Sequence, residues 1–396
     1  MSRPTFEVAD LIHAQGARFV DQHRQHLSYQ QLKVLRAIAQ CRTAALGGHI
    51  DDCPRCSHQA ISYNSCRDRY NSCRDRHCPK CQAQARQRWL AAREQEVLGV
   101  PYFHVVFTLP HALIPLCQRN PRILYDLLFQ ASAAAMLEVA ADPKHLGAQI
   151  GFLSILHTWG QNLLPHPHVH CVIPAGGLSP DRTRWVRPKY PFFLPGKVLS
   201  RVFRGKFVNR LKRAFRKKKL QFPPANAALE QSQLFLRFLR TLFREDWVVY
   251  AKPAFGGARK VLRYLGRYTH RVAISNHRLL AFDGERVTFR WKDYARGNKQ
   301  RQMTLTASEF LRRFLQHVLP RGFVRIRQFG FLANSCRTAR LRLIRELLPQ
   351  PREPPCASVA SDARTWNCPR CGGPMKIGVP LTAAELASRC SFFDSS

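Results

Sequence analysis

Acidic residues are scarce in this sequence of 396 residues, which has 25 Asp and Glu against 63 Lys and Arg and a formal net charge of +38 at pH 7. A basic excess of that size is the electrostatic signature of a polyanionic partner, and nucleic acid is the default partner. The imbalance does not indicate disorder, because 45% of the residues are hydrophobic, as in globular proteins.

Membrane-spanning and secretory segments are also missing from the sequence. No apolar run approaches the roughly 20 residues that a membrane span requires. The first residues, Met-Ser-Arg-Pro-Thr-Phe-Glu, lack the charged and apolar regions of a signal peptide. We therefore expect no membrane partner and a cytoplasmic protein associated with the nucleoid. The 14 cysteines would stay reduced there, which favours metal ligands over disulfides.

The length and the apolar patterns predict an α+β protein of two or three domains. Residues 5–40 and 121–141 have helical spacing, and Tyr102–Thr108 is a strand rich in aromatic and β-branched residues. With a hairpin at 151–177, this order predicts a central antiparallel sheet with helices on one face, preceded by a small helical and zinc-ribbon domain. The domain boundaries we expect are 1–100, 101–335 and 336–396.

The same periodicities and turn signals predict the secondary structure of the remaining segments. Asp283-Gly284 between two apolar runs is a strong signal for a β-hairpin. We also expect helices at 82–97, 226–244 and Thr306–Leu319, a strand at 247–251, a loop at 178–195 and a linker at 350–367.

Two Cys-x-x-Cys knuckles near the N-terminus predict a structural zinc site. Their four thiolates can complete a tetrahedral Zn²⁺ site that has no open position, so its role would be to fold a DNA-binding surface. The predicted ligands are Cys53, Cys56, Cys78 and Cys81. Spare candidates are Cys41, His49, His58, Cys66, Cys73 and His77, and a second ion stays open.

A third knuckle, Cys368-Pro-Arg-Cys371, lies beyond the expected linker and forms half of a zinc site. Cys356 or Cys390 could complete it, and whether this knuckle binds zinc stays open.

The hairpin at 151–177 contains the first candidate catalytic group. His168 and His170 flank a single apolar Val169, and alternation along a strand sends both imidazoles to the same face, where they could grip one ion. If residues 160–167 form the loop, Trp159 lies opposite His168 and His157 opposite His170, so that three imidazoles converge.

A second candidate group is Tyr264-Leu-Gly-Arg-Tyr268. Residues four apart share one face of a helix, so both phenols would point the same way. The basic residues around them, Arg263, Arg267 and Arg271, make a setting for a phosphate.

A third region suited to phosphates is the basic helix expected after residue 195. Large apolar residues recur there at every fourth position between Leu199 and Phe215, and basic residues without an acid occupy the other side. Such a helix packs on its apolar face and can meet DNA with its basic face. The residues we expect at DNA are Lys212, Arg213, Arg216 and Lys217.

Together these segments resemble the rolling-circle transposases of the insertion sequence 91 family, which are two-tyrosine members of the HUH endonuclease superfamily. The resemblance covers nearly the whole chain. It rests on 157–161, 166–171, 264–268, 271–276, Lys292-Asp293-Tyr294, Gly330-Phe-Leu-Ala-Asn334 and the N-terminal cysteines.

The resemblance implies a Rep-like HUH fold with His168 and His170 as metal ligands and Tyr264 and Tyr268 as nucleophiles. It implies a transposase that nicks and rejoins single-stranded DNA at element ends through 5′-phosphotyrosine intermediates. Mg²⁺ or Mn²⁺ would be the catalytic ion and Zn²⁺ the structural one. The oligomeric state is not determined by the sequence, and self-association stays open.

The sequence offers two main candidates for the third ligand of the catalytic ion. His157 is our choice because the expected pairing puts it on the face of the His168 and His170 pair, and Gln161 is the runner-up because it could reach over from the loop. A one-residue slip in the hairpin would turn His157 to the opposite face. His166 is less suitable, since Pro167 follows it and the loop would point it outward.

A tandem repeat interrupts the zinc region. Tyr63-Asn-Ser-Cys-Arg-Asp-Arg69 recurs without change at Tyr70–Arg76. The family pattern has one copy directly before His-Cys-Pro-Lys-Cys, so the second copy keeps that register, and we expect the first copy to form an extra basic loop. Whether the duplication impairs activity stays open.

Two other function classes were weighed. A transposase of the three-carboxylate type needs Asp and Glu converging on two metal ions, and the few acidic residues here lie in no matching motif. A non-catalytic zinc-ribbon nucleic-acid-binding protein would explain the charge and the knuckles, but it leaves the histidine hairpin and the paired tyrosines without a role.

Overall fold

The computed structural model describes residues 5–65, 76–81, 89–93, 96–189, 193–255, 266, 273–293, 296–349, 367–386 and 388. The chain forms two compact units. Unit 1 comprises Met1–Ala85, Ile274–Val318 and Glu353–Ser396, and unit 2 comprises Arg86–Ala273 and Leu319–Arg352. This division differs from the predicted boundaries, because the chain passes between the units more than once and its C-terminal part joins the N-terminal unit.

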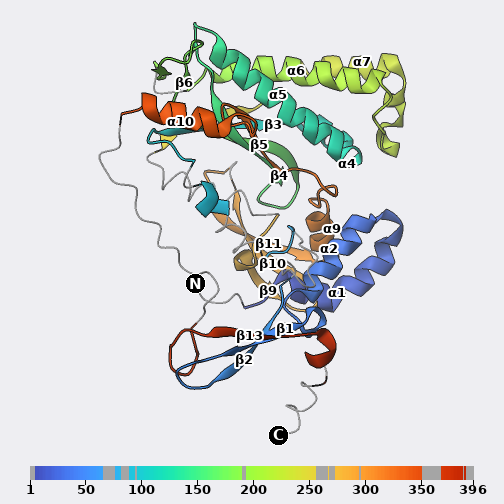
Figure 1. The fold of residues 1–396 in the computed structure, drawn as a ribbon. Coiled ribbons are helices and arrows are strands. Elements are labelled where there is room, and N and C mark those ends of the chain that lie inside the picture. The colour runs from blue at the N-terminus through green and yellow to red at the C-terminus, as the bar shows by residue number, and fades with distance from the viewer. Residues whose placement is uncertain are drawn as a thin grey trace. The chain divides into compact units, whose positions relative to one another are not determined.

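Unit 2 is built on a five-stranded sheet in the order β12-β4-β5-β3-β8, with every neighbouring pair antiparallel. The predicted central antiparallel sheet is therefore confirmed (Figure 1). Its strands are β3 (Tyr102–Thr108), β4 (Gly151–Trp159), β5 (Pro165–Pro174), β8 (Val249–Phe255) and β12 (Ile326–Gly330).

Helices cover one face of this sheet (Figure 1). Helix α5 spans Pro121–Ala141, as predicted, and α6 spans Gly196–Arg216. The alternate strand residues that face these helices are apolar, and they form the largest core of the unit together with buried residues of α5 and α6. At its centre the rings of Phe107 on β3 and Phe203 on α6 meet edge to face, 5.0 Å apart.

Helix α5 corrects one expectation drawn from sequence. By length and composition, its 21 residues could cross a membrane. Among the described residues it is the one helix for which this holds. The expectation that no apolar run approaches this length was therefore wrong. Inside unit 2 the helix has an ordinary explanation. Leu124, Leu128, Met136 and other side chains are buried in the core, which is what makes the segment so apolar.

The opposite face of the sheet is divided in two. Toward one end, Leu153 and Ile155 of β4 and Val172 of β5 pack with Leu341 and Ile344 of α10 (Arg337–Leu347). Toward the other end, the same strands carry histidines instead of aliphatic residues. This half of the sheet face forms the candidate site described below.

Unit 1 combines two N-terminal helices with a second sheet. The helices α1 (Val8–His23) and α2 (Tyr29–Gln40) confirm the helical interpretation of residues 5–40, and Ser28 with Gln31 forms a capping box at the start of α2. The sheet has the order β11-β10-β9, formed by Lys299–Thr306, Arg286–Asp293 and Leu279–Phe282.

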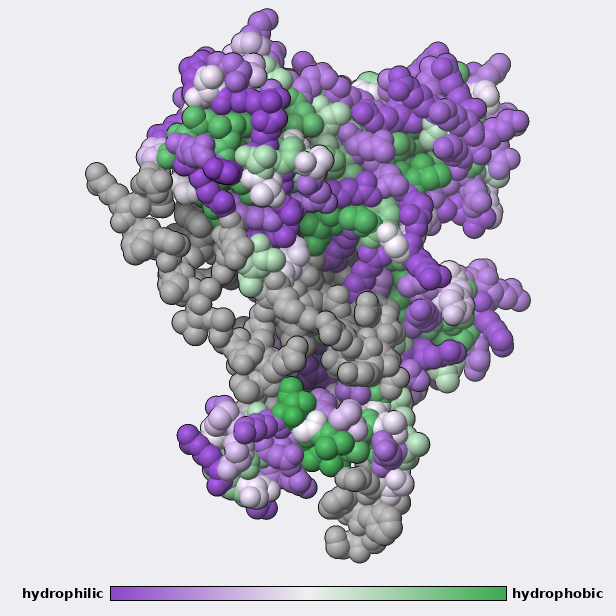
Figure 2. Space-filling view, viewed as in Figure 1, coloured by the Kyte–Doolittle hydropathy of each residue, from purple (hydrophilic) through white to green (hydrophobic). Residues whose placement is uncertain are grey.

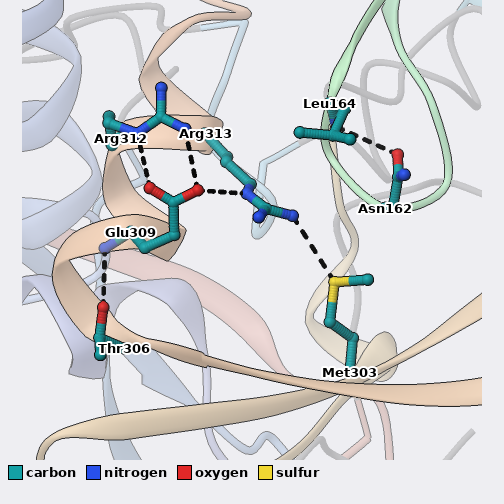
Figure 3. Close-up of polar contacts among 7 residues, drawn as sticks. All are labelled: Asn162, Leu164, Met303, Thr306, Glu309, Arg312 and Arg313. Atoms are coloured by element: carbon teal, nitrogen blue, oxygen red, sulfur yellow. Dashed lines mark hydrogen bonds and ion pairs between the residues drawn. The ribbon is translucent and has the colours of Figure 1, made fainter.

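The predicted Asp283-Gly284 hairpin joins β9 to β10. The Asp283 carboxylate accepts hydrogen bonds from the backbone N–H groups of Glu285 and Arg286. Helix α9 (Ala307–Leu315) follows β11 and ends four residues earlier than expected. Thr306 caps α9, and Glu309 in its first turn holds Arg312 and Arg313 (Figure 3).

A small third sheet brings the two ends of the chain together in unit 1. Its order is β13-β1-β2, formed by Lys376–Leu381, Gly48–Asp52 and Gln59–Tyr63 (Figure 1). The C-terminal strand β13 thus pairs with the N-terminal strand β1. Most of the expected linker at 350–367 lies outside the described residues.

The remaining elements are short. The expected helix at 226–244 divides into a 3₁₀ segment η4 (Pro224–Glu230) and α7 (Ser232–Thr241), and the expected loop at 178–195 contains part of a two-stranded ribbon. The other elements are η1 (Arg24–His26), η2 (Ala44–Leu46), η3 (His111–Leu113), α4 (Ile114–Arg119), β6 (Gly177–Leu178), β7 (Trp185–Val186) and η5 (Asn276–Arg278).

Gly330 lies at the end of the edge strand β12, at a position where only glycine fits. It ends β12 opposite Gly151 of β4 and has φ +62°. A Cβ at this position would lie 1.8 Å from the carbonyl oxygen of Ile150. Both the positive φ and the close backbone therefore require glycine.

We predict that Gly330→Ala destabilises the protein by about 3 kcal/mol or more, because the clash is with backbone and adds to the cost of the left-handed conformation. The measurement is urea unfolding of the full chain. Gly322→Ala is the matched control, since Gly322 has φ +71° with no atom near its Cβ, and it should lose only about 1–2 kcal/mol. Equal losses for the two variants would contradict the steric argument.

Candidate active site

The β4–β5 hairpin holds the histidines in a register that differs from the predicted one. His157 pairs with His168, and Trp159 pairs with Pro165. The predicted pairing of His157 with His170 was therefore wrong by two residues, and that of Trp159 with His168 was wrong by three, because the register shifts between His157 and Trp159. An even shift leaves each side chain on the same face of the sheet, so His157 still shares a face with His168 and His170.

A short turn causes the difference in register. The turn covers Gly160–Leu164 instead of the whole segment 160–167, and the Gly160 N–H donates to the Leu164 carbonyl over 2.8 Å. The Asn162 side chain accepts from the Leu164 N–H over 3.2 Å (Figure 3). Strand β5 begins at once with Pro165, and an irregularity between His157 and Trp159 absorbs the extra residue. Gln161, the alternative ligand, lies in this turn.

Three imidazoles converge on this face of the hairpin. The Nε2 atoms of His168 and His170 are 3.0 Å apart, and Nδ1 of His157 lies 3.1 Å from Nε2 of His170. All three side chains are at least 90% buried. Neighbouring ligands of an octahedral ion with bonds of about 2.1 Å are separated by about 3.0 Å, so both nitrogen distances suit three adjacent positions around one ion.

Two of the imidazoles, those of His168 and His170, are held neutral, as is required of an imidazole that binds a metal ion. Burial, together with the neighbouring imidazoles, lowers the pKa of His168 to about 3 and the pKa of His170 well below its ordinary value. Nδ1 of His168 lies 2.6 Å from the backbone carbonyl of His166. A neutral His168 therefore donates its N–H to that carbonyl and leaves the Nε2 lone pair facing the other two rings.

A fourth histidine, His104 of β3, belongs to the same cluster and was missed from the sequence. It is 3% exposed, and its Nε2 lies 2.8 Å from Nδ1 of His170. This contact engages the ring nitrogen of His170 that faces away from His157 and His168, so it can hold the tautomer that keeps Nε2 of His170 available as a ligand. The feature of the sequence that could have identified His104 is its position as a histidine within a strand of mostly apolar residues.

The site is bordered by aromatic residues on both sides. The indole of Trp159 stacks on the His157 imidazole with ring centroids 4.5 Å apart, which fixes the orientation of that ring. On the edge strand β8, Tyr250 pairs with Val106, which in turn pairs with His170. Directly paired residues share a face, so the half-exposed Tyr250 phenol lies on the histidine side of the sheet.

Some predicted site residues lie outside the residues that the structure describes. They include both predicted nucleophiles and the basic residues around them, and all of these assignments stay predictions. The undescribed residues are Tyr264, Tyr268, Arg263, Arg267 and Arg271. Most of the tandem heptapeptide repeat, residues 66–75, is likewise outside the described part of the chain.

The predicted basic helix is present as α6, and the structure places it away from the histidines. Its apolar stripe, including Phe203 and Phe207, is buried against the sheet face opposite the site. Its basic residues point outward from that face: Arg213, Arg216 and Lys217 are exposed, and Lys212 is half-buried. Figure 2 shows a mostly hydrophilic surface over α6 and α7. DNA bound to the basic side of α6 would therefore lie on the opposite side of the sheet from the histidine cluster.

The cysteines are grouped differently from the prediction. Cys53 and Cys56 were expected to share one ion with Cys78 and Cys81, but the structure separates the two knuckles. The first cluster comprises Cys53, Cys56, Cys368 and Cys371, and the second comprises Cys41, Cys78 and Cys81. The reason is that β13 brings the third knuckle to β1, while Cys41 at the end of α2 lies beside Cys81.

Two family models match most of the chain between residues 11 and 339. A family model described as "Putative transposase" matches residues 151–339, which include the histidine hairpin. A second, described as "Transposase zinc-binding domain", matches residues 11–70 and 68–109. The two matched segments overlap inside the tandem heptapeptide, as expected if one copy is an insertion.

Two curated relatives cover most of the chain. A "Putative transposase" of Sinorhizobium fredii is 52% identical over 357 residues, which are 89% of this chain and 88% of the relative. The transposase for insertion sequence element IS801 of Pseudomonas savastanoi pv. phaseolicola is 29% identical over 369 residues, covering 87% of this chain and 82% of the relative. No solved structure matches the chain.

We predict that His157→Ala raises the Mn²⁺ concentration needed for half-saturation by at least about tenfold, as expected when a ligand is removed. The measurement is free Mn²⁺ by electron paramagnetic resonance, which requires no DNA. His166→Ala is the control, because the His166 ring contacts His168 but is not one of the three converging imidazoles, and the Mn²⁺ affinity of this variant should not change. A weaker site in Gln161→Ala, with His157→Ala unchanged, would transfer the role to the glutamine.

Proposed function

Because this chain belongs to the insertion sequence 91 family of transposases, we propose that it nicks and rejoins single-stranded DNA at element ends through 5′-phosphotyrosine intermediates. The observation that carries this proposal is the convergence of three buried imidazoles on one face of the β4–β5 hairpin, two of which, His168 and His170, are held neutral by burial. A protein that only bound DNA would gain nothing from desolvating three histidines side by side.

His157, His168 and His170 would hold the catalytic divalent ion. Three imidazole nitrogens on one side leave the other coordination positions open to a substrate oxygen, and this donor set accepts Mn²⁺ and other transition metals, with Mg²⁺ the abundant cellular alternative. When bound, the ion supplies positive charge beside the scissile phosphate and orients it. His104 keeps His170 in the ligating tautomer, and Trp159 fixes the His157 ring.

The nucleophile would be the phenol of Tyr264 or Tyr268. Its oxygen forms a bond to phosphorus as the bond to the 3′ oxygen breaks, the phenol loses its proton, and the 3′ oxygen gains one. The products are a 5′-phosphotyrosine and a free 3′-hydroxyl. The covalent link preserves the energy of the phosphodiester, so the strands can be rejoined without ATP. Two tyrosines four residues apart allow two such links in turn, one for the donor strand and one for its resolution on a target.

Two groups of basic residues would bind different parts of the DNA. Arg263, Arg267 and Arg271, which are next to the two tyrosines in sequence, would contact the phosphates around the cleaved bond. Lys212, Arg213, Arg216 and Lys217 lie on the other side of the sheet and would hold a more distant part of the substrate. The net charge of +38 favours binding to chromosomal DNA, which is why we expect the protein at the nucleoid.

We predict that the double variant Tyr264→Phe, Tyr268→Phe forms no covalent adduct with labelled single-stranded DNA but still binds it, because only the nucleophilic oxygens are removed. Each single variant should form an adduct yet fail in complete strand transfer. Adducts are counted on denaturing gels. Tyr250→Phe is the control, since that phenol also lies on the histidine face, and it should behave as the parent. An adduct formed by the double variant at the parental rate would refute the assignment, and a lost adduct in Tyr250→Phe would move it to Tyr250.

We predict that His104→Leu weakens Mn²⁺ binding by about tenfold, in the range typical for the loss of a group that orients a ligand. His104→Gln should retain most of the affinity, because the glutamine carbonyl can still accept a hydrogen bond from Nδ1 of His170. Free Mn²⁺ is measured as for His157. Equal losses in both variants would indicate packing at this position and contradict the orienting role.

A further inference from the structure

Two Cys-x-x-Cys knuckles from opposite ends of the chain meet in unit 1. Sγ of Cys53 lies 3.4 Å from Sγ of Cys371, and Sγ of Cys56 lies 3.6 Å from Sγ of Cys368. All four sulfurs lie within 4.8 Å of one another. The paired residues are 318 and 312 positions apart in the sequence, so local chain geometry cannot account for the meeting.

The backbones of the two knuckles have the same hydrogen-bond pattern. The N–H of Cys53 donates to the carbonyl of His58 over 2.9 Å, and the N–H of Cys368 donates to the carbonyl of Gly373 over 2.7 Å. The residue four positions after the first cysteine of each knuckle is Ser57 or Gly372. Its backbone N–H donates to the carbonyl of that cysteine over 2.9 Å. Both of these residues have positive φ, 53° and 70°. Each knuckle therefore presents its two sulfurs in the same way.

The spacing of the sulfurs fits a tetrahedral metal site and excludes disulfides. A disulfide requires about 2.05 Å between sulfurs, well below the observed 3.4 and 3.6 Å. Four thiolates about 2.3 Å from a zinc ion are separated by about 3.8 Å along the edges of the tetrahedron. The observed distances are close to that value.

Each knuckle contributes one buried and one exposed cysteine to the cluster. Cys53 and Cys368 are buried with Met375 in a small apolar core of their own, while Cys56 and Cys371 are exposed. Strands β1 and β13 run directly from the two knuckles and pair Asp52 with Lys376.

We propose that Cys53, Cys56, Cys368 and Cys371 hold one zinc ion that fastens the C-terminal segment 367–388 to the N-terminal zinc-binding region. Neither matching family model extends to this segment, since they end at residues 109 and 339. The zinc region is thus completed by the last part of the chain. Cys41, Cys78 and Cys81 belong to a separate site, with Sγ of Cys41 and Cys81 3.2 Å apart.

The shared ion has a consequence for folding. It closes a loop of more than 300 residues that contains all of unit 2, and metal binding adds to the pairing of β13 with β1 in offsetting the entropy cost of that closure. A chain that ends before residue 367 would keep half of the site and lose the edge strand β13 of the small sheet. The C-terminal segment therefore controls whether the zinc region is complete.

The test counts zinc ions on the purified full chain by native mass spectrometry. Cys53→Ser and Cys368→Ser should each bind one zinc ion fewer than the parent. The double variant should lose no more than either single one, because both residues serve the same ion. Cys336→Ser is the control, since Cys336 lies outside both clusters, and His168→Ala is a second; both should keep the parental zinc content.

Two results would overturn the proposal: unchanged zinc in Cys368→Ser, or a loss of two ions in the double variant, which would mean that the knuckles bind separate ions. A conservative variant distinguishes the replacement of a zinc ligand from misfolding of the protein. Cys371→His should keep the zinc content, and its cobalt-loaded form should show weaker sulfur-to-cobalt absorption than the parent, as expected when one of four thiolates is replaced. Unchanged cobalt absorption in Cys371→His would also contradict the shared site.

Discussion

Antiparallel pairing between β4 and β5 is the interaction on which the rest of unit 2 depends. It aligns His157 with His168, and it gives the two strands one apolar face for α5 and α6 and one face for the histidines. The same pleat therefore supplies the hydrophobic core and the candidate metal ligands. A slip by one residue would exchange the two faces and bury imidazoles under the helices while exposing Phe152 and Val169. The core thus enforces the register that the site requires.

The histidine site also shows how burial and hydrogen bonding act together. Desolvation keeps His168 and His170 neutral, which makes their lone pairs available but does not decide which nitrogen carries the proton. That choice is made by neighbours: the His166 carbonyl faces Nδ1 of His168, and His104 faces Nδ1 of His170. Because these partners come from the hairpin itself and from the adjacent strand, the centre of the sheet holds the candidate ligands in place.

Unit 1 is organised by a different constraint, the return of the C-terminus to the N-terminal region. Strand β13 adds to β1, and the knuckle before it meets the knuckle after β1. Small sheets of short strands bury little apolar area and are weakly stable on their own. A metal shared between the strands would compensate for that deficit. Such an arrangement would make the zinc region depend on residues from both the N-terminal and the C-terminal parts of the sequence, with unit 2 between them.

What the sequence determined by itself was local. Alternation placed His168 and His170 on one face, the limits of α5 and the Asp283-Gly284 hairpin were correct, and the two N-terminal knuckles were recognised as part of a zinc-binding region. These features follow from backbone periods and turn chemistry that act over a few residues. The tertiary structure decided the contacts over long separations: His104 with His170 across 66 residues, and Cys56 with Cys368 across 312. It also turned the basic side of α6 away from the histidines. No local pattern encodes such partners, because they depend on the path of the whole chain and on which apolar faces must be buried together.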